Sequence, residues 1–309
     1  MPFFNSFIKK LFFNTDVVKT FFILRLSKNQ VKEKAFIKSA AGDIDISSRH
    51  SMICLDPFCV AIWLSAEELS KIDPANVNMQ IRDGAALRAS LVLSLTEKTE
   101  EKNCHLLLLK VEKAKCHQYN PVSHFVLFYY LLRNKTSKYK ERETISALYS
   151  YPRNVIVVSY KDDTYFNIFP MDIQGYIPGS DLYLLGLRTT NITLEKILNT
   201  KKLVVCDTDT IDVKTIYSLG KHLSAAPPKV EELPFKTINS ELFGFPVPDL
   251  IGSYHEIEII RHQKMGYHML LVGRIVNTTK LKTDTASLYH IGYLEYKKSS
   301  YREAFQDVY

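Results

Sequence analysis

The chain has 309 residues, of which 46% are hydrophobic, and a formal net charge of +7 at pH 7. This length is enough for two domains with separate cores, and the composition is typical of a globular protein rather than a disordered or fibrous one. The charge is modest and the sequence contains no zinc-knuckle, homeodomain or RNA-binding motif. We therefore expect no nucleic-acid partner, and an anionic small molecule fits the charge at least as well.

The five cysteines are an odd number, and no two of them form a CxxC pair. Cys54 and Cys59 lack a second pair at zinc spacing, and the histidines near Cys104 and Cys116 match no common zinc site. We therefore expect reduced, buried thiols in a cytoplasmic protein and no metal site.

The N-terminal segment 1–13 is rich in phenylalanine, but polar residues interrupt its apolar run before it reaches about 10 residues. No small-residue cleavage site follows, and no segment approaches the roughly 18 apolar residues that a membrane span requires. We predict no membrane association and an amphipathic arm that packs on the protein itself. The alternative is a helix that lies on a membrane surface.

The first half is predicted to be mostly β. Short apolar runs bounded by turn residues are typical of buried strands. Ser65 and Glu68 form a capping-box pattern, which predicts a short helix over 66–72. The predicted strands are two within 21–39, then 52–55, 59–64, 77–81, 86–95 and 105–111.

A charged run without apolar periodicity, 133–144, is the predicted domain boundary. We divide the chain into a mostly-β N-terminal domain with its arm, 1–145, and a C-terminal domain, 146–309. In the second domain we predict helices over 194–199 and 213–219, the latter ending at Gly220 as helices commonly do. The predicted strands are 154–160, 181–187, 203–206, 247–253, 256–261, 268–276 and 288–294.

The segment between the strand 181–187 and the following helix has the side chains that a phosphate group needs. Hydroxyl and amide groups donate hydrogen bonds, a guanidinium adds positive charge, and the start of a helix is electropositive. The alternative is an ordinary strand-to-helix loop in which Asn191 or Thr193 caps the helix and Arg188 lies on the surface. The candidate phosphate ligands are Arg188, Thr189, Thr190, Asn191 and Thr193.

Several pieces of the second half resemble one family. They are Pro152-Arg153 before a Val/Ile strand, a turn into Asn167-x-x-Pro170, and Arg188…Thr193…Ile197…Thr200 before Leu203-Val-Val. The pattern continues through Leu219-Gly220, Pro246-Val-Pro248, Gly266-Tyr-His268 and Val272-Gly-Arg274 to Tyr293. In order and spacing these pieces are similar to the flavin reductase-like, FMN-binding split-barrel proteins, and they cover about residues 146–309.

This resemblance implies an FMN cofactor, with the phosphate on the segment described above. It also implies that the segment after Asn167 lies along the isoalloxazine ring with backbone amides bonded to ring atoms, and that Phe169 and Met171 cover a ring face. The family more often has a small residue beside the proline and a serine shortly after it, so Phe169 and Asp172 depart from the pattern. The alternative is a proline-containing bulge in a strand. The candidate ring-binding residues are Asn167, Ile168, Phe169, Pro170, Met171 and Asp172.

Two further residues match family positions near the flavin, His268 and Tyr293. Related flavin reductases often carry Gly-Asp-His where this chain has Gly266-Tyr267-His268, and the loss of the acidic residue weakens the inference of nicotinamide binding. The alternative for His268 is a structural histidine at the start of a core strand.

The resemblance implies an FMN-binding flavoprotein that moves hydride or electrons between NAD(P)H and the flavin. The flavin supplies this redox chemistry, so we name no catalytic residue. The alternative is a non-catalytic flavin-binding or scaffold protein on the same fold. A relative of pyridoxamine-phosphate oxidases is a third interpretation, but the sequence offers no basic cluster for a second phosphate.

The two halves show weak internal similarity. Aligning His105 with His268, an offset of 163 residues, also pairs leucines and a tyrosine, while Leu69–Ile72 resembles Leu194–Ile197 at an offset of 125 residues. The change of offset requires an insertion in one half, and both duplication and chance explain so few identities. Family members usually dimerise, so a duplicated chain with a degenerate split barrel over 20–135 would form an intramolecular pseudo-dimer. The alternative is a homodimer.

Overall fold

The computed structural model describes residues 21–101, 104–117, 139–177, 179–283, 286–292, 301 and 305–306. This part of the chain consists mostly of strands with short helices, so the predicted β-barrel class is confirmed. No helix within these residues is long and apolar enough to cross a membrane. The predicted N-terminal arm, Tyr293 and residues 133–138 of the charged run lie outside the described residues.

The first half of the chain forms one seven-stranded antiparallel sheet in the order β3-β2-β6-β7-β8-β5-β4. Its strands are β2 (Glu33–Ser39), β3 (Gly42–Asp45), β4 (His50–Leu55), β5 (Phe58–Leu64), β6 (Val77–Asp83), β7 (Ala86–Glu101) and β8 (Cys104–Cys116). The short helix α2 (Ala66–Leu69) has the predicted cap, because Ser65 accepts a hydrogen bond from the Glu68 amide and Glu68 bonds back to Ser65.

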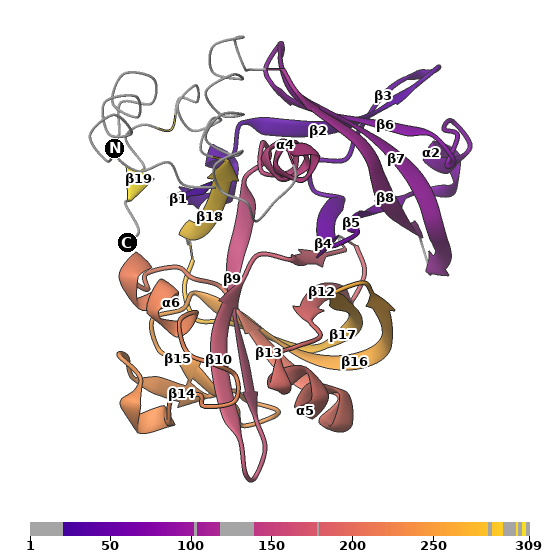
Figure 1. Cartoon of the computed structure of the whole chain (residues 1–309). Coiled ribbons are helices and arrows are strands. Elements are labelled where there is room, and N and C mark those ends of the chain that lie inside the picture. The colour runs from indigo at the N-terminus through magenta and orange to yellow at the C-terminus, as the bar shows by residue number, and fades with distance from the viewer. Residues whose placement is uncertain are drawn as a thin grey trace.

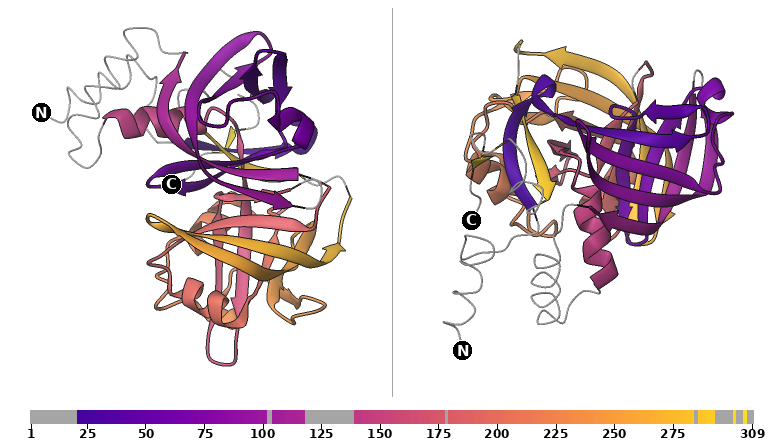
Figure 2. Two further views of the ribbon diagram at one scale, coloured as in Figure 1. Left: turned by 90° about the vertical axis from the view of Figure 1, so that its right-hand side faces the viewer. Right: turned by 90° about the horizontal axis from the view of Figure 1, so that it is seen from above.

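The second half forms a ten-stranded sheet in the order β11-β12-β17-β16-β13-β9-β18-β1-β19, with β10 paired to β9. The two sheets appear as adjoining curled lobes, indigo to purple for the first and mostly pink to yellow for the second, in which the indigo strand β1 lies beside the yellow β18 (Figure 1, Figure 2). The strands are β1 (Phe21–Ser27), β9 (Arg153–Lys161), β10 (Phe166–Met171), β11 (Gln174–Tyr176), β12 (Leu182–Arg188), β13 (Lys202–Cys206), β16 (Ser253–Met265), β17 (His268–Lys280), β18 (Ala286–Gly292) and β19 (Phe305–Gln306).

Helices and short elements connect these strands. They are η1 (Lys28–Gln30), α4 (Tyr139–Leu148), α5 (Ile192–Thr200), α6 (Val213–Leu219) and η2 (Val230–Glu232), with the small hairpin of β14 (Thr237–Asn239) and β15 (Pro246–Pro248). The helix predicted over 213–219 and its end at Gly220 are confirmed.

The two sheets have the same strand order once β18, β1 and β19 are set aside. Numbering the strands of each half from β2 and from β9 gives 2-1-5-6-7-4-3 in both cases. The long hairpins also carry bulges at matching places, at Val92/Leu93 and Leu95/Glu97 in β7 and at Glu256/Ile257 and Ile259/Arg261 in β16. Each pair is separated by 164 residues (92 to 256, 95 to 259). Shared irregularities of this kind support an internal repeat.

The structure corrects the register of the proposed repeat by one residue. At an offset of 164, Leu107 of β8 matches Leu271 of β17, and each lies in the core of its own half. At the predicted offset of 163, Leu107 would match Leu270, which instead faces the other half. Side chains alternate between the faces of a strand, so a shift of one residue exchanges inside and outside. The predicted insertion is the segment 207–252 between β13 and β16.

Three elements differ from their predicted places. β1 pairs with β18 and so belongs to the sheet of the second half, although its sequence lies in the first. Helix α4 occupies part of the predicted linker, because Ala147 and Leu148 at its end are buried in the core of the first half. The strand predicted over 247–253 is short, since only β15 forms before a turn leads into β16. The boundary between 145 and 146 stays a prediction.

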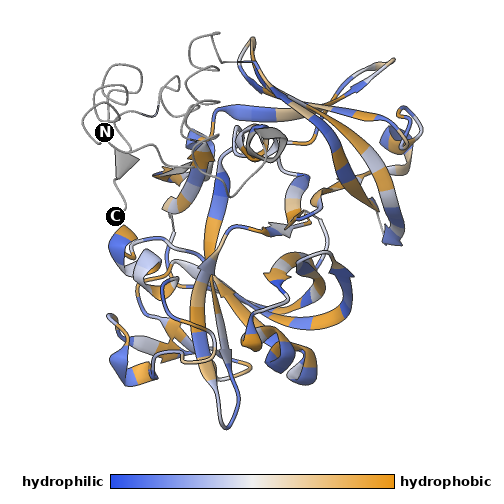
Figure 3. Cartoon of the chain, in the orientation of Figure 1, coloured by the Kyte–Doolittle hydropathy of each residue, from blue (hydrophilic) through white to orange (hydrophobic). Residues whose placement is uncertain are grey.

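An apolar cluster joins the two halves. It consists of Ile53, Cys54, Cys59, Ala61, Trp63, Leu106 and Leu108 from the first half and Ile177, Leu182, Leu184, Met265, Leu270 and Val272 from the second. Hydrophobic and hydrophilic residues alternate along many strands (Figure 3), as expected where one face of a sheet is exposed. By contrast β5, at the junction of the two halves, is an apolar run buried on both faces. At Gly186 a Cβ atom would collide with the carbonyl oxygen of Ile53, so β12 and β4 touch backbone to backbone.

We predict that Gly186→Ala destabilises the protein. In an unobstructed strand alanine would stabilise by roughly 0.5–1 kcal/mol relative to glycine, but here the added methyl meets rigid backbone, and overpacking typically costs about 1–3 kcal/mol. Urea unfolding of Gly186→Ala should therefore give a lower free energy of unfolding than wild type. Gly220→Ala is the matched control, because its Cβ would lie 3.4 Å from Pro170, an ordinary contact. Equal stability of the two variants would contradict the close contact.

Candidate functional site

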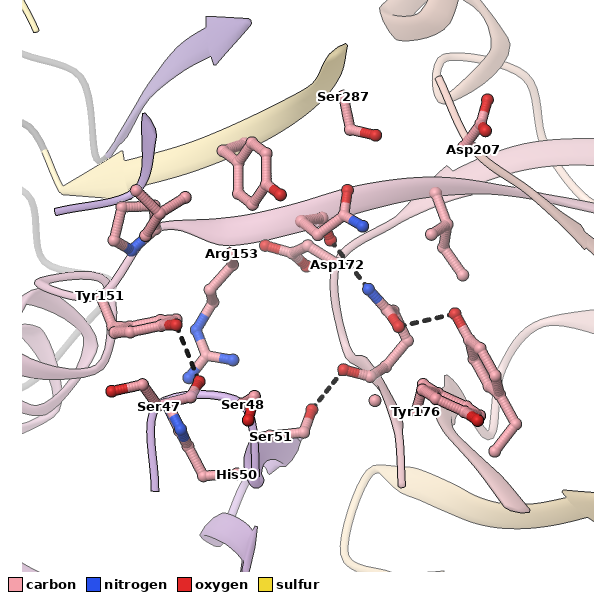
Figure 4. A pocket seen from close by; sticks show the side chains of 18 of the residues that line it. Ser47, Ser48, His50, Ser51, Tyr151, Arg153, Asp172, Tyr176, Asp207 and Ser287 are labelled. Carbon is pink, nitrogen blue, oxygen red and sulfur yellow. Dashed lines mark hydrogen bonds between the residues drawn. The ribbon is translucent and has the colours of Figure 1, made fainter. Parts of the chain in front are cut away.

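A cavity of about 750 Å³ lies between the two halves. One wall is the start of β9 with the preceding Tyr151 and Pro152, another is the segment from Asp172 to Tyr176, and the first half contributes Ser47 to Ser51 apart from Arg49. Figure 4 shows these side chains converging from β9, from the segment after β10 and from β4 and its preceding loop. A pocket of this volume accommodates a ligand of nucleotide size.

Arg153 is the central charged group of this cavity. It begins β9 directly after Pro152, opposite His290 of β18, and only 7% of its surface is exposed. Its side chain leaves β9 toward Tyr151 and the segment that carries Ser47 and Ser48 (Figure 4). Its guanidinium carbon lies 5.6 Å from the centre of the Tyr149 ring. Burial lowers the pKa of Arg153, but a guanidinium keeps its charge in proteins.

This guanidinium lacks the partners that a buried charge requires. Its Nε atom has no hydrogen-bond partner, and within the described part of the chain no carboxylate lies within ion-pair distance of it. A buried, uncompensated charge costs several kcal/mol, so such groups normally meet an opposite charge or a hydrogen-bond acceptor. An anionic ligand in the cavity would supply both.

Two further buried atoms without partners line the same cavity. Trp63 Nε1 is an unpaired donor and Asn154 Oδ1 an unpaired acceptor among the described residues. Buried polar groups are nearly always hydrogen-bonded, and their exceptions call for an explanation such as a ligand or ordered water. Two donors and an acceptor without partners around one space favour a polar ligand there.

The other end of the cavity is aromatic. Tyr176 and His255 are stacked with ring centres 6.4 Å apart and an angle of 9°, and Tyr183 donates a 2.7 Å hydrogen bond to Gln174. Burial lowers the pKa of His255 and raises the pKa of Asp207, which both line this end. The cavity thus joins a charged region, lined by Arg153 and Lys34 and by the carboxylates of Glu33, Asp45 and Asp172, to one walled by flat rings.

Asp172 is the acidic neighbour of Arg153, but its carboxylate already has partners. Tyr149 donates to Oδ2 over 2.7 Å, and His290 Nδ1 lies 2.7 Å from the same oxygen. Burial alone would raise the pKa of Asp172, but the charge and hydrogen bond of His290 and the hydrogen bond of Tyr149 outweigh it and lower the pKa to about 2.

The predicted FMN residues Asn167 and Thr193 are brought together, but they bond to each other. Asn167 Nδ2 donates to Thr193 Oγ1 over 2.7 Å, and the exposed fractions of the two residues are only 1% and 0%. Tyr165 bonds to the same hydroxyl, and His222 bonds to Asn167 Oδ1. The side chains of Asn167 and Thr193 therefore bond to each other and to Tyr165 and His222, and flavin binding by the backbone amides after Asn167 stays a prediction.

The remaining predicted phosphate ligands lie around the start of α5. Asn191 caps the helix by accepting a 3.0 Å hydrogen bond from the Thr193 amide, and Arg188 and Thr190 are exposed. Thr189 lies in the turn and bonds to the Tyr267 carbonyl. This arrangement matches the alternative of a capped loop with a surface arginine. Phosphate binding by these residues stays a prediction.

The predicted ring-binding segment, 167–172, forms most of β10 and pairs with β9. Ile168 is buried, while Phe169 and Met171 pack partly buried against the core. Helix α6 packs on β10, and Gly220 approaches Pro170. Of this segment only Asp172 lines the cavity.

His268 lies opposite Arg188 at the start of β17 and is buried. Its Nδ1 is 3.6 Å from Cys54 Sγ of the first half, and its pKa is lowered by burial.

Sequence reasoning missed Arg153 as a site residue, although Pro152-Arg153 is one of the pieces that carry the family resemblance. It also missed Ser47 to Ser51, for which the sequence offered no signal.

No family model and no curated protein matches the sequence. Solved structures of flavin reductases and FMN-binding proteins do match the fold. An FMN-binding protein from Thermus thermophilus with bound p-hydroxybenzaldehyde is 18% identical over 46% of this chain and 83% of its own, with a TM-score of 0.41.

The NADH:FAD oxidoreductase SgcE6 of Streptomyces globisporus is 14% identical over 50% of this chain and 90% of its own, with a TM-score of 0.44. The flavin reductase PheA2 is 18% identical over 48% of this chain and 96% of its own, with a TM-score of 0.40. The chain therefore resembles these proteins over about half its length. At such identities the likeness concerns the path of the backbone, and what those proteins bind is a property of those proteins.

We predict that Asp172 stabilises the fold in a pH-dependent way. Its pKa of about 2 lies below the ordinary 3.8. Its stabilisation is thus fully present above about pH 4 and is lost as the pH falls toward 2. A shift of this size corresponds to roughly 2 kcal/mol. Asp172→Asn should lower the free energy of unfolding at pH 7. The difference in free energy of unfolding between this variant and wild type should become smaller between pH 4 and 2.

Asp163→Asn, at an exposed position on the turn before β10, is the control for the loss of a carboxylate. Urea unfolding across this pH range measures both variants. A gap for Asp172→Asn that does not change with pH would contradict the role of the carboxylate charge.

Proposed function

We propose that this protein binds a flavin nucleotide, FMN, in the cavity between its two halves. The buried guanidinium of Arg153 carries the proposal, because it needs an anion and faces a space large enough for one with a ring system attached. Arg153 would hold the phosphate, helped by the hydroxyl groups of Ser47 and Ser48. Charge-assisted hydrogen bonds between a guanidinium and a phosphate are roughly twice as strong as hydrogen bonds between neutral groups.

The aromatic end of the cavity suits the isoalloxazine ring. Tyr176 and Tyr183 offer flat faces, and Asn154 and Trp63 offer an acceptor and a donor for polar ring edges. A bound flavin supplies hydride and electron transfer, and the protein supplies binding, orientation and exclusion of water.

The finer activity that we propose is NAD(P)H-dependent reduction of the flavin, supported by the resemblance of residues 152–274 to flavin reductases. We also propose that one chain acts as an intramolecular pseudo-dimer. Its support is the common strand order of the two sheets and the apolar cluster between them. A cytoplasmic location is proposed from five cysteines that are all free.

A second candidate is a non-catalytic binding or scaffold protein on the same fold. One observation favours it, namely that Tyr165 and His222 occupy the hydrogen-bonding groups of Asn167 and Thr193. In this case the site of the resembling family has been closed, and the cavity binds a ligand without redox turnover.

We predict that the purified protein retains FMN after desalting, with an absorbance band near ~450 nm and a resolved shoulder, as a flavin in a preorganised pocket gives. Bleaching of this band by NADH or NADPH under anaerobic conditions distinguishes the reductase from the binding protein. A colourless protein that retains no FMN would contradict flavin binding and leave the scaffold as the better interpretation.

Two arginine substitutions distinguish the cavity from the predicted loop. We expect Arg153→Met to raise the FMN dissociation constant about 10- to 100-fold, because a charge-assisted contact contributes roughly 1.5–3 kcal/mol. Arg188→Ala should leave the constant unchanged if FMN lies in the cavity and should raise it if the predicted loop holds the phosphate. Isothermal titration calorimetry measures both.

Thermal unfolding provides the folding control. Removing an unpaired buried charge should not lower the melting temperature of Arg153→Met in the absence of ligand. Loss of FMN binding only in Arg188→Ala would move the proposed site from the cavity to the start of α5.

A further inference from the structure

Arg153 does not stand alone but ends a chain of contacts that crosses the second half. The chain begins at Tyr217 of α6, whose hydroxyl contacts His290 Nε2. His290 of β18 bonds through Nδ1 to Asp172, which also accepts the hydrogen bond of Tyr149. The Tyr149 ring in turn lies beneath the Arg153 guanidinium.

The carboxylate of Asp172 fixes the direction of the two hydrogen bonds at the centre of this chain. Asp172 is ionised and can only accept, so His290 must carry a proton on Nδ1. On the other side of the ring, His290 Nε2 contacts the Tyr217 hydroxyl, and the protonation of Nε2 decides which of these two atoms donates. Each group is thereby fixed by the next, and the carboxylate of Asp172 receives two hydrogen bonds on one oxygen.

Two consequences follow for Arg153. The Tyr149 ring is only 5% exposed, and its hydroxyl is held by Asp172. It therefore holds the guanidinium in a fixed position through a cation–π interaction. His290 and Tyr149 also engage Asp172, which among the described residues is the carboxylate whose charge acts on the guanidinium. The charge of Arg153 therefore stays directed to the cavity instead of being neutralised within the protein.

We propose that Tyr149 positions the Arg153 guanidinium and that His290 keeps Asp172 away from it, so that Arg153 can bind the phosphate group of the ligand. The identity of the ligand as FMN rests on the proposed flavin function. The binding of an anionic group by Arg153 does not depend on it. Tyr149, Asp172 and His290 are positioning residues, and the ligand meets Arg153. Tyr217 comes from the segment 207–252, which the first half lacks.

The test compares FMN with riboflavin, which has the same ring but no phosphate. Tyr149→Leu removes the ring and the hydroxyl, whereas Tyr149→Phe keeps the ring. We expect the FMN dissociation constant to rise about tenfold in Tyr149→Leu and about threefold or less in Tyr149→Phe. Riboflavin affinity should stay within about twofold of wild type in both. Equal losses for FMN and riboflavin, or equal losses in the two variants, would overturn the proposal.

A double substitution tests the role of His290. His290→Leu should weaken FMN binding because Asp172 becomes free to pair with Arg153. Adding Asp172→Asn should restore the affinity, since the competing charge is gone, whereas a merely structural role predicts a further loss. A double variant that binds no better than His290→Leu, while both fold, would overturn this part.

Inorganic phosphate separates this inference from the flavin proposal. If wild type binds phosphate but not FMN, the flavin proposal fails. The phosphate affinities of the same variants, measured by thermal shift, then test the positioning roles, and they should fall in the order given above for FMN. If wild type binds neither anion, both proposals are overturned.

Discussion

The close contact between β4 of the first half and β12 of the second is the constraint on which the rest of the structure depends. Gly186 allows the backbone of β12 to contact the Ile53 carbonyl. Gly175 leaves room for Ser51, because a Cβ atom at position 175 would lie only 2.7 Å from the Cβ of Ser51. Apolar residues of both sheets pack around this contact in one cluster. This docking sets Ser47 to Ser51 opposite the start of β9, and the cavity is the space that remains between them.

Buried charge gives the cavity its chemical character. The second half places a cation, Arg153, and an anion, Asp172, near each other but pairs only the anion. Fully pairing both would give a more stable fold with a neutral wall, whereas leaving the guanidinium without a partner costs stability and favours an anionic ligand. The local balance of hydrogen bonds, rather than the net charge of the chain, thus decides what the cavity can bind.

The segment 207–252 explains why the two halves differ despite a common strand order. It supplies His222, which bonds to Asn167, and Tyr217, which bonds to His290. One contact closes the group that the family resemblance assigns to the flavin, and the other supports the acidic neighbour of Arg153. The segment 207–252 therefore occupies the side chain of Asn167 and supports the contacts around Asp172 and Arg153.

The sequence by itself determined the β class, most strands of both halves, the capping box at Ser65 and the end of α6 at Gly220. These features depend on local periodicity and on side chains within a few residues of one another. It also indicated a repeat with an insertion, but not its register, because strands with apolar residues on both faces do not show which face points inward.

Only the tertiary structure decided the site. Arg153 belongs to the pieces that carry the family resemblance, but its burial and lack of a partner arise from elements as distant in sequence as β4 and β18 and could not be read from the sequence. Asn167 and Thr193 have the right residue types for binding, but whether their hydrogen bonds reach a ligand or each other depends on Tyr165 and His222. Polar groups are assigned to structure or to function by their partners, and those partners are fixed only when the chain has folded.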